Sequence, residues 1–220
     1  MVELYGPFSQ RVCDATAAPL LRLARLVLDL EITGRENLPV GSGAVIAANH
    51  LSHIDPPVVS ISVGANVRYL ALDELYGRSR FFDALTLFTG AIPMSRERPP
   101  LGAMRTALAH LGDHGLVGLF PEGRRVERWG DAAPKRGAAW LAVRTGLPLV
   151  PVAIAGTEGT LSLSEPSVHR VAVRAWIEPP ILAETFAGSP DRLGDMMEEW
   201  RLALDRRLAP WPAARSGAVG

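Results

Sequence analysis

The sequence predicts an α/β fold, in which a mixed, largely parallel sheet is covered by helices and preceded by an amphipathic helix. Short apolar runs alternate with longer segments of helical periodicity, a pattern typical of α/β chains. With 220 residues, 48% of them apolar and 21% charged, the chain suits one globular domain that needs no disulfide or metal for stability. No stretch reaches the roughly 18 consecutive apolar residues of a membrane-spanning helix.

The first helix is expected at residues 13–30. Arg22, Arg25 and Asp29 recur at helical spacing and form a narrow polar stripe on a surface otherwise rich in Leu, Ala and Val. Two interpretations stay open: the helix packs on the core with its stripe in water, or it lies in a membrane interface where its arginines meet headgroups. The predicted division of the chain is a helical segment, a folded domain and a disordered tail, at 1–30, 31–209 and 210–220.

Six apolar runs are expected to form strands, at residues 43–48, 67–72, 91–94, 116–120, 149–155 and 171–177. Five helices are expected at 57–63, 80–88, 101–111, 137–145 and 192–208. Asp55 is interpreted as the N-cap of the first of these helices, because Pro56 follows it at a position where a missing N–H is harmless. Binding sites in such folds lie beyond the carboxyl ends of the strands, where His50, Arg96 and residues 121–123 are placed.

The charges and the cysteine content narrow the class of protein. Basic and acidic residues balance at 23 each, so the net charge gives no reason to expect a nucleic-acid partner. Cys13 is the only cysteine, which excludes an intramolecular disulfide and indicates a reducing compartment. The N-terminus shows no signal-peptide pattern. We therefore expect a soluble or peripheral protein.

His50 and Asp55 lie where a strand ends and a helix begins. A strand-to-helix turn can fold His50 back so that its imidazole meets the Asp55 carboxylate, the pairing that a general base needs. His53 lies between them, which also makes a metal site conceivable. The other histidines have no neighbours that complete a recognisable ligand set, so no metal is expected.

Three more segments carry residues suited to substrate binding. Residues 120–125, Phe-Pro-Glu-Gly-Arg-Arg, follow a strand with a carboxylate and two guanidinium groups, and arginine forks match phosphate geometry. Arg96 ends another strand. Pro151 removes a donor from a buried strand, which implies an edge, a bulge or a bend that faces the site.

Together the four elements resemble the four motifs of the glycerophosphate acyltransferase superfamily, most closely those of 1-acylglycerol-3-phosphate acyltransferases. The motifs stand in register over roughly residues 30 to 160, as Asn49-His50-x-Ser52-x-x-Asp55, Gly90 to Arg96, Phe120-Pro121-Glu122-Gly123 and Val150-Pro151-Val152. The resemblance implies that His50 removes a proton from an acceptor hydroxyl while Asp55 orients the ring, and that the fold is that of glycerol-3-phosphate acyltransferases.

The resemblance also implies roles for the remaining site residues. Arg96, Glu122 and Gly123 resemble the acceptor site, and Arg125 aligns with a common arginine of the third motif. Pro151 resembles a residue on the acyl-donor side. Arg124 stands where the family often has a small hydroxyl residue, and this extra cation implies a tighter hold on phosphate or a different headgroup.

The implied activity is transfer of a fatty acyl group to the sn-2 hydroxyl of 1-acylglycerol 3-phosphate, giving phosphatidic acid for phospholipid synthesis. The implied partners are acyl-CoA or acyl-carrier protein as co-substrate, a lysophospholipid acceptor and a membrane surface, with no cofactor. We expect a peripheral enzyme on the cytoplasmic face of the plasma membrane. The alternatives are the same reaction on another lysolipid or metabolite, a metal-dependent hydrolase built on His50, His53 and Asp55, and a catalytically silent lipid- or carrier-binding module.

Overall fold

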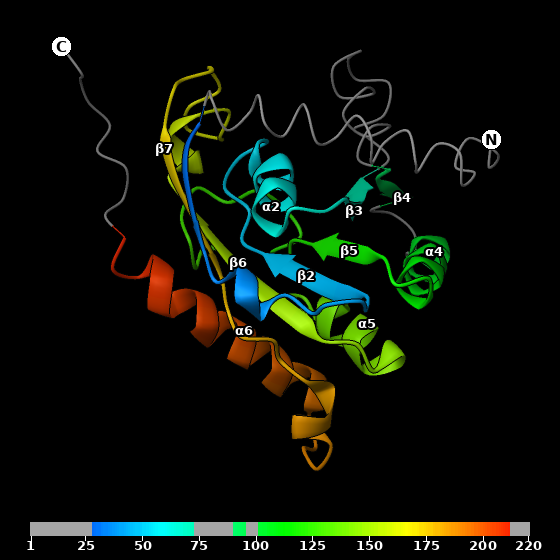
Figure 1. Ribbon diagram of the computed structural model, residues 1–220. Helices are drawn as coiled ribbons and strands as arrows, with labels where there is room; N and C mark the ends of the chain where they lie inside the picture. The colour runs from blue at the N-terminus through cyan, green and yellow to red at the C-terminus, as the bar shows by residue number, and fades with distance from the viewer. Residues whose placement is uncertain (1–27, 73–89, 96–100, 212–220) are drawn as a thin grey trace.

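The computed structural model describes residues 28–72, 90–95 and 101–211 of the chain, and they form one sheet with helices on both faces (Figure 1). The seven strands of these residues lie in the order β1-β7-β6-β2-β5-β3-β4. All neighbouring pairs are parallel except β6 and β7, which are antiparallel. The prediction of a mixed, largely parallel sheet covered by helices is therefore confirmed.

The strands are β1 (Asp29–Thr33), β2 (Ala44–Ala48), β3 (Val67–Leu72), β4 (Ile92–Met94), β5 (Leu116–Leu119), β6 (Leu149–Ala155) and β7 (Ala172–Ile177). The α-helices are α2 (Asp55–Val63), α4 (Leu101–Gly112), α5 (Gly137–Thr145) and α6 (Arg192–Leu208). Three short 3-10 helices complete the order: η1 (Arg35–Asn37), η3 (Thr157–Gly159) and η4 (Ala183–Phe186). None of the helices in the described ranges is long and apolar enough to cross a bilayer.

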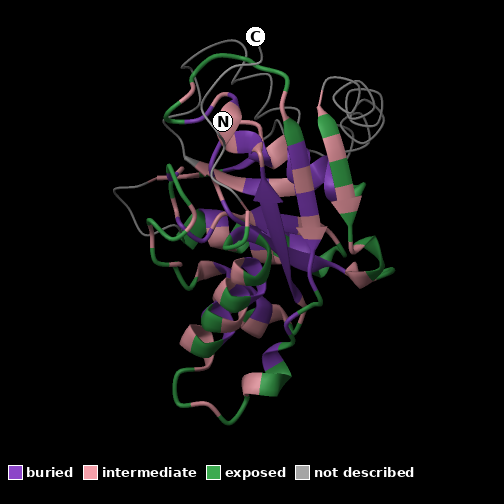
Figure 2. Ribbon diagram, turned by 90° about the vertical axis from the view of Figure 1, so that its left-hand side faces the viewer, coloured by how far each residue is buried: buried purple, intermediate pink, exposed green. Residues whose placement is uncertain are grey.

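The two central strands are buried along their whole length, which explains why their sequences are continuous apolar runs (Figure 2). Successive residues of a strand point to opposite faces of the sheet. Val45 and Ala47 accordingly pack with α4, α5 and α6, whereas Ile46 and Ala48 pack with α2. The strand that leads into the predicted site is thus held by apolar contacts on both faces.

A buried tryptophan fixes the longest helix to this strand. Trp200 of α6 is fully buried, and its indole N–H donates to the carbonyl of Ala47 at 2.9 Å. Ala47 lies three residues before His50. The amphipathic α6 therefore supports the end of β2 from the face opposite α2.

The expected helix at 13–30 is wrong at its end, because Asp29 and Leu30 belong to β1. The rest of that helix, residues 13–27, lies outside the described residues, as do the expected helix at 80–88 and residues 212–220 of the expected tail. β1 pairs in parallel with the distant β7, with Asp29 alongside Ala172. A five-residue edge strand whose partner lies so far along the chain gives little local signal. The predicted domain boundary at residue 30 therefore falls inside a strand.

Candidate active site

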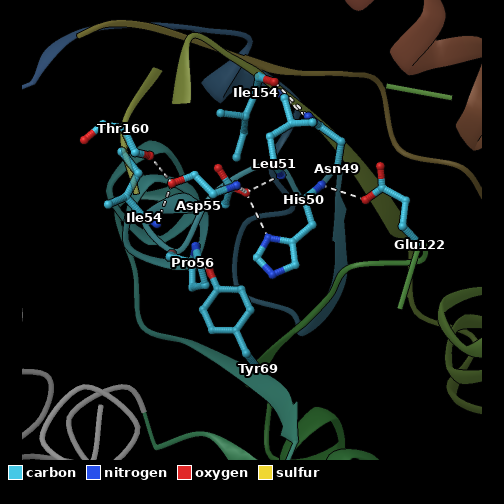
Figure 3. A network of polar contacts seen from close by, with 11 residues as sticks. Asn49, His50, Leu51, Ile54, Asp55, Pro56, Tyr69, Glu122, Ile154 and Thr160 are labelled. Atoms are coloured by element: carbon cyan, nitrogen blue, oxygen red, sulfur yellow. Dashed lines mark hydrogen bonds and ion pairs between the residues drawn. The ribbon is translucent and has the colours of Figure 1, made fainter. Parts of the chain in front are cut away.

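His50 and Asp55 meet as the sequence predicts (Figure 3). The Nδ1 atom of His50 lies 2.9 Å from Oδ2 of Asp55. The side chain of Asp55 is fully buried, whereas that of His50 keeps 18% of its surface exposed. Because a carboxylate accepts, the shared hydrogen belongs to Nδ1, and Nε2 carries the lone pair. Within residues 28–72, 90–95 and 101–211, no hydrogen bond engages Nε2.

The Asp55 carboxylate also organises the turn that carries His50. The backbone N–H groups of Leu51 and Ser52 each donate to the same Oδ2 atom, both at 2.7 Å. Three donors on one oxygen compensate a buried negative charge. The prediction that Asp55 caps α2 is wrong: Ile54 occupies the N-cap position, and Asp55 is the first helical residue. Its side chain bonds backward to the turn instead of forward to the helix.

Buried polar side chains lock this turn onto the sheet. The Asn49 amide donates to the carbonyl of Ile154 and accepts from the N–H of Ile154, both at 2.8 Å. The side chain thereby extends the pairing of β2 with β6 beyond the last strand residue. The Ser52 hydroxyl donates to the carbonyl of Thr160 at 2.6 Å. These contacts fix the position of His50 between them.

Glu122 lies behind His50. Its Oε2 atom accepts the backbone N–H of His50 at 2.7 Å, and the N–H of Val126 donates to the His50 carbonyl at 2.9 Å. Glu122 is 3% exposed, and among the described residues its Oε1 atom has no hydrogen-bond partner. Burial raises the pKa of this carboxyl to about 8; the charge of Asp55 acts in the same direction, and the bond from His50 opposes it. Glu122 and Val126 thus hold the main chain of His50 at its N–H and at its carbonyl.

Two aromatic rings support the imidazole. The Phe120 ring stacks on His50 with centroids 4.1 Å apart and an interplanar angle of 19°. Tyr69 stacks behind Phe120, with centroids 5.7 Å apart. The Tyr69 hydroxyl donates to the carbonyl of Pro56 at 2.8 Å and contacts the Ser60 hydroxyl at 3.0 Å. Burial holds the pKa of Tyr69 well above its usual range, so this hydroxyl stays neutral.

Gly123 allows the side chain of Lys135 to approach the main chain next to Glu122. Its φ of 70° favours glycine, and a Cβ atom there would collide with the end of the Lys135 side chain. The backbone N–H of Lys135 donates to the carbonyl of Pro121 at 2.8 Å. Arg124 is exposed next to this glycine, and Arg125 is half-buried. Lys135 therefore adds an ammonium group beside the third motif, which Arg124 and Arg125 follow directly.

Pro151 lies in a central strand, so the expectation of an edge is wrong and that of a bulge is confirmed. Leu149 pairs with Ile181, whereas Val152 pairs with Ile177. Three steps along β6 therefore match four along the other chain segment, which defines a β-bulge. The extra residue lies in the segment after β7, opposite Pro151, whose carbonyl accepts the N–H of Glu178 at 2.9 Å.

The structure thus gathers His50, Asp55, Glu122 and Gly123 and places Pro151 alongside β2, while Arg96 lies outside the described residues. The sequence interpretation gave no role to Phe120, Lys135 or Tyr69. Phe120 lies inside a quoted motif and Lys135 lies near one, so the sequence alone could have suggested that both are close to the site. Tyr69 carried no such signal, because it reaches the histidine only through Phe120.

The metal-site alternative lacks its ligand set. In the part of the chain that the structure describes, no group of three His, Cys, Asp or Glu side chains could hold a metal ion. His50 directs Nδ1 to Asp55, and the Oδ2 atom of Asp55 already accepts three hydrogen bonds. His53 uses its backbone N–H to reach the carbonyl of Leu161 at 3.0 Å. The Nδ1 atom of His50 and the Oδ2 atom of Asp55 thus hold the turn together instead of facing a common centre.

Known proteins are similar to this chain in sequence and in fold. A family model described as Acyltransferase matches residues 29–155. The chain is 30% identical over 184 residues to the 1-acyl-sn-glycerol-3-phosphate acyltransferase of Bacillus subtilis (strain 168), covering 81% of this chain and 86% of that protein. It is 28% identical over 156 residues to the chloroplastic 1-acyl-sn-glycerol-3-phosphate acyltransferase LPAT1 of Arabidopsis thaliana, covering 69% of this chain and 43% of that protein. The crystal structure of the 1-acyl-sn-glycerophosphate (LPA) acyltransferase PlsC from Thermotoga maritima shares the fold, with a TM-score of 0.70 at 22% identity over 92% of this chain and 80% of that one.

Proposed function

This chain belongs to the acyltransferase family, and we propose that it transfers a fatty acyl group to the sn-2 hydroxyl of 1-acylglycerol 3-phosphate, giving phosphatidic acid. The acyl donor in this proposal is acyl-CoA or acyl-carrier protein. The single observation that carries the proposal is the contact of 2.9 Å between His50 Nδ1 and Asp55 Oδ2, which leaves Nε2 of a partly exposed imidazole as a base. The relatives named 1-acyl-sn-glycerol-3-phosphate acyltransferases support the choice of acceptor.

The proposed reaction needs one base and no covalent enzyme intermediate. Nε2 of His50 takes the proton of the acceptor hydroxyl while the oxygen of that hydroxyl attacks the thioester carbonyl carbon. The tetrahedral intermediate then collapses, the carbon–sulfur bond breaks, and the imidazolium returns the proton to the leaving thiolate. The Asp55 carboxylate stabilises the imidazolium between these two steps.

The binding roles follow the motifs. Arg124 and Arg125, together with Lys135 beside Gly123, offer cations to the acceptor phosphate, and Arg96 is assigned to the same subsite by its motif. We assign Pro151 to the acyl-donor side. Glu122 acts through the His50 peptide group, since its observed contact is with that backbone N–H. We propose that the enzyme works as a peripheral protein on the cytoplasmic face of the plasma membrane, where its lipid acceptor resides.

The test compares His50→Ala with His53→Ala, which alters the same turn outside the His50–Asp55 pair. We expect His50→Ala to lower thiol release from acyl-CoA in the presence of 1-acylglycerol 3-phosphate by at least about 10²-fold. His53→Ala should keep most of the activity, since the proposed mechanism does not use that ring. Turnover retained in His50→Ala would contradict the assignment of the base.

An acceptor panel tests the choice of lipid. With one acyl-CoA and free thiol as readout, 1-acylglycerol 3-phosphate should react faster than lysophosphatidylcholine, lysophosphatidylethanolamine or glycerol 3-phosphate. A preference for another lysolipid would keep the mechanism and transfer the proposal to that headgroup. The exposed Arg124 is the position that favours this second candidate, because it replaces the family's small hydroxyl residue with a cation.

A further inference from the structure

The segment from η3 to β7 forms a loop of residues 160–170 that is bonded to the catalytic turn. We call it the 160–170 knob. The Ser52 hydroxyl donates to the carbonyl of Thr160 at 2.6 Å, and the N–H of His53 donates to the carbonyl of Leu161 at 3.0 Å. A β-bridge also joins Ser52 to Ser162. The knob follows the carboxyl end of β6, and β2, which runs parallel to β6, leads into the His50 turn at the same end of the sheet (Figure 1).

Polar contacts within the knob brace it. The backbone N–H of Leu161 donates to the carbonyl of Ser167 at 3.0 Å, and the N–H of Ser162 donates to the carbonyl of Glu165 at 2.8 Å. The Thr160 hydroxyl accepts the N–H of His169 at 2.9 Å. The imidazole of His169 also lies 3.3 Å from the Glu165 carboxylate. Hydrogen bonds within the knob and to the Ser52–His53 turn therefore set its shape.

This braced loop holds two large apolar side chains in water. Leu163 is 48% exposed and Val168 is 74% exposed. A single exposed apolar residue is ordinary on a protein surface. Leu163 and Val168 both lie on this one self-bonded loop, which is fixed to the turn that carries the base, and we call them the apolar tip of the knob.

Exposed cations lie on the knob and on a second loop that is bonded to the same turn. Arg170 is exposed at the end of the knob, and Arg124, Arg128 and Lys135 are exposed on the neighbouring loop. That loop reaches the same turn through the bond from the Val126 N–H to the His50 carbonyl. Glu127 and Asp131 are the acidic residues exposed between Arg124 and Lys135, so cations remain in excess there. Apolar side chains flanked by cations fit the boundary between the acyl chains and headgroups of an anionic bilayer.

We propose that the 160–170 knob inserts Leu163 and Val168 into the headgroup boundary of an anionic phospholipid bilayer, and so places the His50 turn at the membrane surface. The inference rests on the proposed function insofar as a lipid acceptor gives the site a reason to face a bilayer. A protein partner fits this surface less well. A stable protein interface buries more than about 1,000 Å², whereas interfacial insertion needs few apolar side chains and nearby cations.

The first experiment places a fluorescent reporter on the knob. Val168→Cys and, as a matched control, Val40→Cys are made in the full chain with Cys13→Ser and labelled with an environment-sensitive fluorophore. Val40 is 99% exposed and lies before β2, at the opposite edge of the sheet. Vesicles of phosphatidylglycerol and phosphatidylcholine should shift the emission of the label at residue 168 to the blue and leave that at residue 40 nearly unchanged.

Three outcomes would overturn the proposal: bound vesicles without a shift at residue 168, equal shifts at both positions, or a shift produced by acyl-carrier protein and not by vesicles. The last would make the knob a protein-docking surface. The readout needs no turnover, so failure of the proposed reaction would not affect it.

A second experiment measures the energetic contribution of the tip. The double variant Leu163→Ser, Val168→Ser should partition at least tenfold more weakly onto the same vesicles, because two apolar side chains lose transfer energies of roughly 1.5–3 kcal/mol each when fully inserted. Val40→Ser should partition as the unmodified protein does. Equal weakening in both variants, or none in the double variant, would contradict the proposal.

Discussion

Glu122 accepts the backbone N–H of His50 at 2.7 Å, and this bond joins residues 72 positions apart in the chain. The third motif therefore touches the first at its main chain, directly behind the imidazole. The proposed base depends in this way on two carboxyl groups: Asp55 holds the ring, and Glu122 holds the backbone N–H.

Asp55→Asn should lower kcat by about 10²- to 10⁴-fold, because a neutral amide no longer stabilises the imidazolium and can impose the wrong tautomer on His50. The KM for either substrate should change little, since the mechanism gives Asp55 no substrate contact. Thiol-release kinetics measure both constants. Asp131→Asn is the matched control, because Asp131 is exposed and accepts only from the N–H of Arg128 among the described residues. Near-normal kcat in Asp55→Asn would show that the carboxylate only shapes the turn.

Glu122→Gln should change how the stability of the protein depends on pH. The pKa of Glu122 is raised from 4.5 to about 8, so the stability provided by the neutral buried form is complete below about pH 4.5 and is lost as the pH rises through about 8. Urea unfolding at about pH 5 and about pH 9 should show a loss of roughly 2–4 kcal/mol that the uncharged glutamine does not show. Parallel pH profiles for the two proteins would mean that Glu122 is ionised throughout this range.

Phe120→Leu should lower kcat about tenfold, because the imidazole loses the ring that fixes its plane and positioning errors reduce catalysis. Tyr69→Phe is the matched control. It keeps the stacked ring but removes the hydroxyl bonds to Pro56 and Ser60, so it should reduce stability by roughly 1–3 kcal/mol with little effect on kcat. Kinetics and urea unfolding of both variants separate the two effects. Equal kinetic losses would show that the tyrosine hydroxyl, and not the stacking, positions His50.

Gly123→Ala and Gly41→Ala form a matched pair, because both glycines have φ near 70°, at 70° and 73°. A Cβ atom at Gly123 would meet the end of Lys135, whereas one at Gly41 would meet nothing within 4 Å. Both changes should reduce stability by about 1 kcal/mol, since the flexible lysine can move aside. Only Gly123→Ala should raise the KM for the lysolipid acceptor, through displacement of the ammonium group. An unchanged KM would exclude Lys135 from the acceptor site.

The sequence predicted the buried parts of the fold well, because β2 and β6 are continuous apolar runs between turn residues. It failed at β1, whose residues alternate between exposed and half-buried and pair with a strand far along the chain. The predicted N-cap of α2 was also wrong, because contacts outside the helix decide where it begins. A carboxylate before two prolines predicts an N-cap, but the amides of the preceding turn compete for the same oxygen.

The pairing of His50 with Asp55 was predictable because it is local, within one strand-to-helix turn. The position of Glu122 behind His50 was not, because that contact follows from the parallel pairing of β2 with β5. Tyr69 and Phe120 become relevant only when β3, β5 and β2 lie side by side, which no spacing in the sequence reveals.

The hydrogen bond between Glu122 and the His50 N–H couples acceptor preference to reaction rate, two properties that an evolving enzyme would benefit from changing separately. A substitution in the buried part of the Pro-Glu-Gly segment that suits a new headgroup also shifts the main chain of His50. Such a substitution therefore lowers the reaction rate for every substrate. Arg124 is free of this constraint, because it extends from the same segment into solvent. Selection for a new lipid can therefore act through that position and leave the main chain of His50 in place, and a directed-evolution library confined to the exposed residues 124 and 128 should change the KM for each acceptor more than kcat.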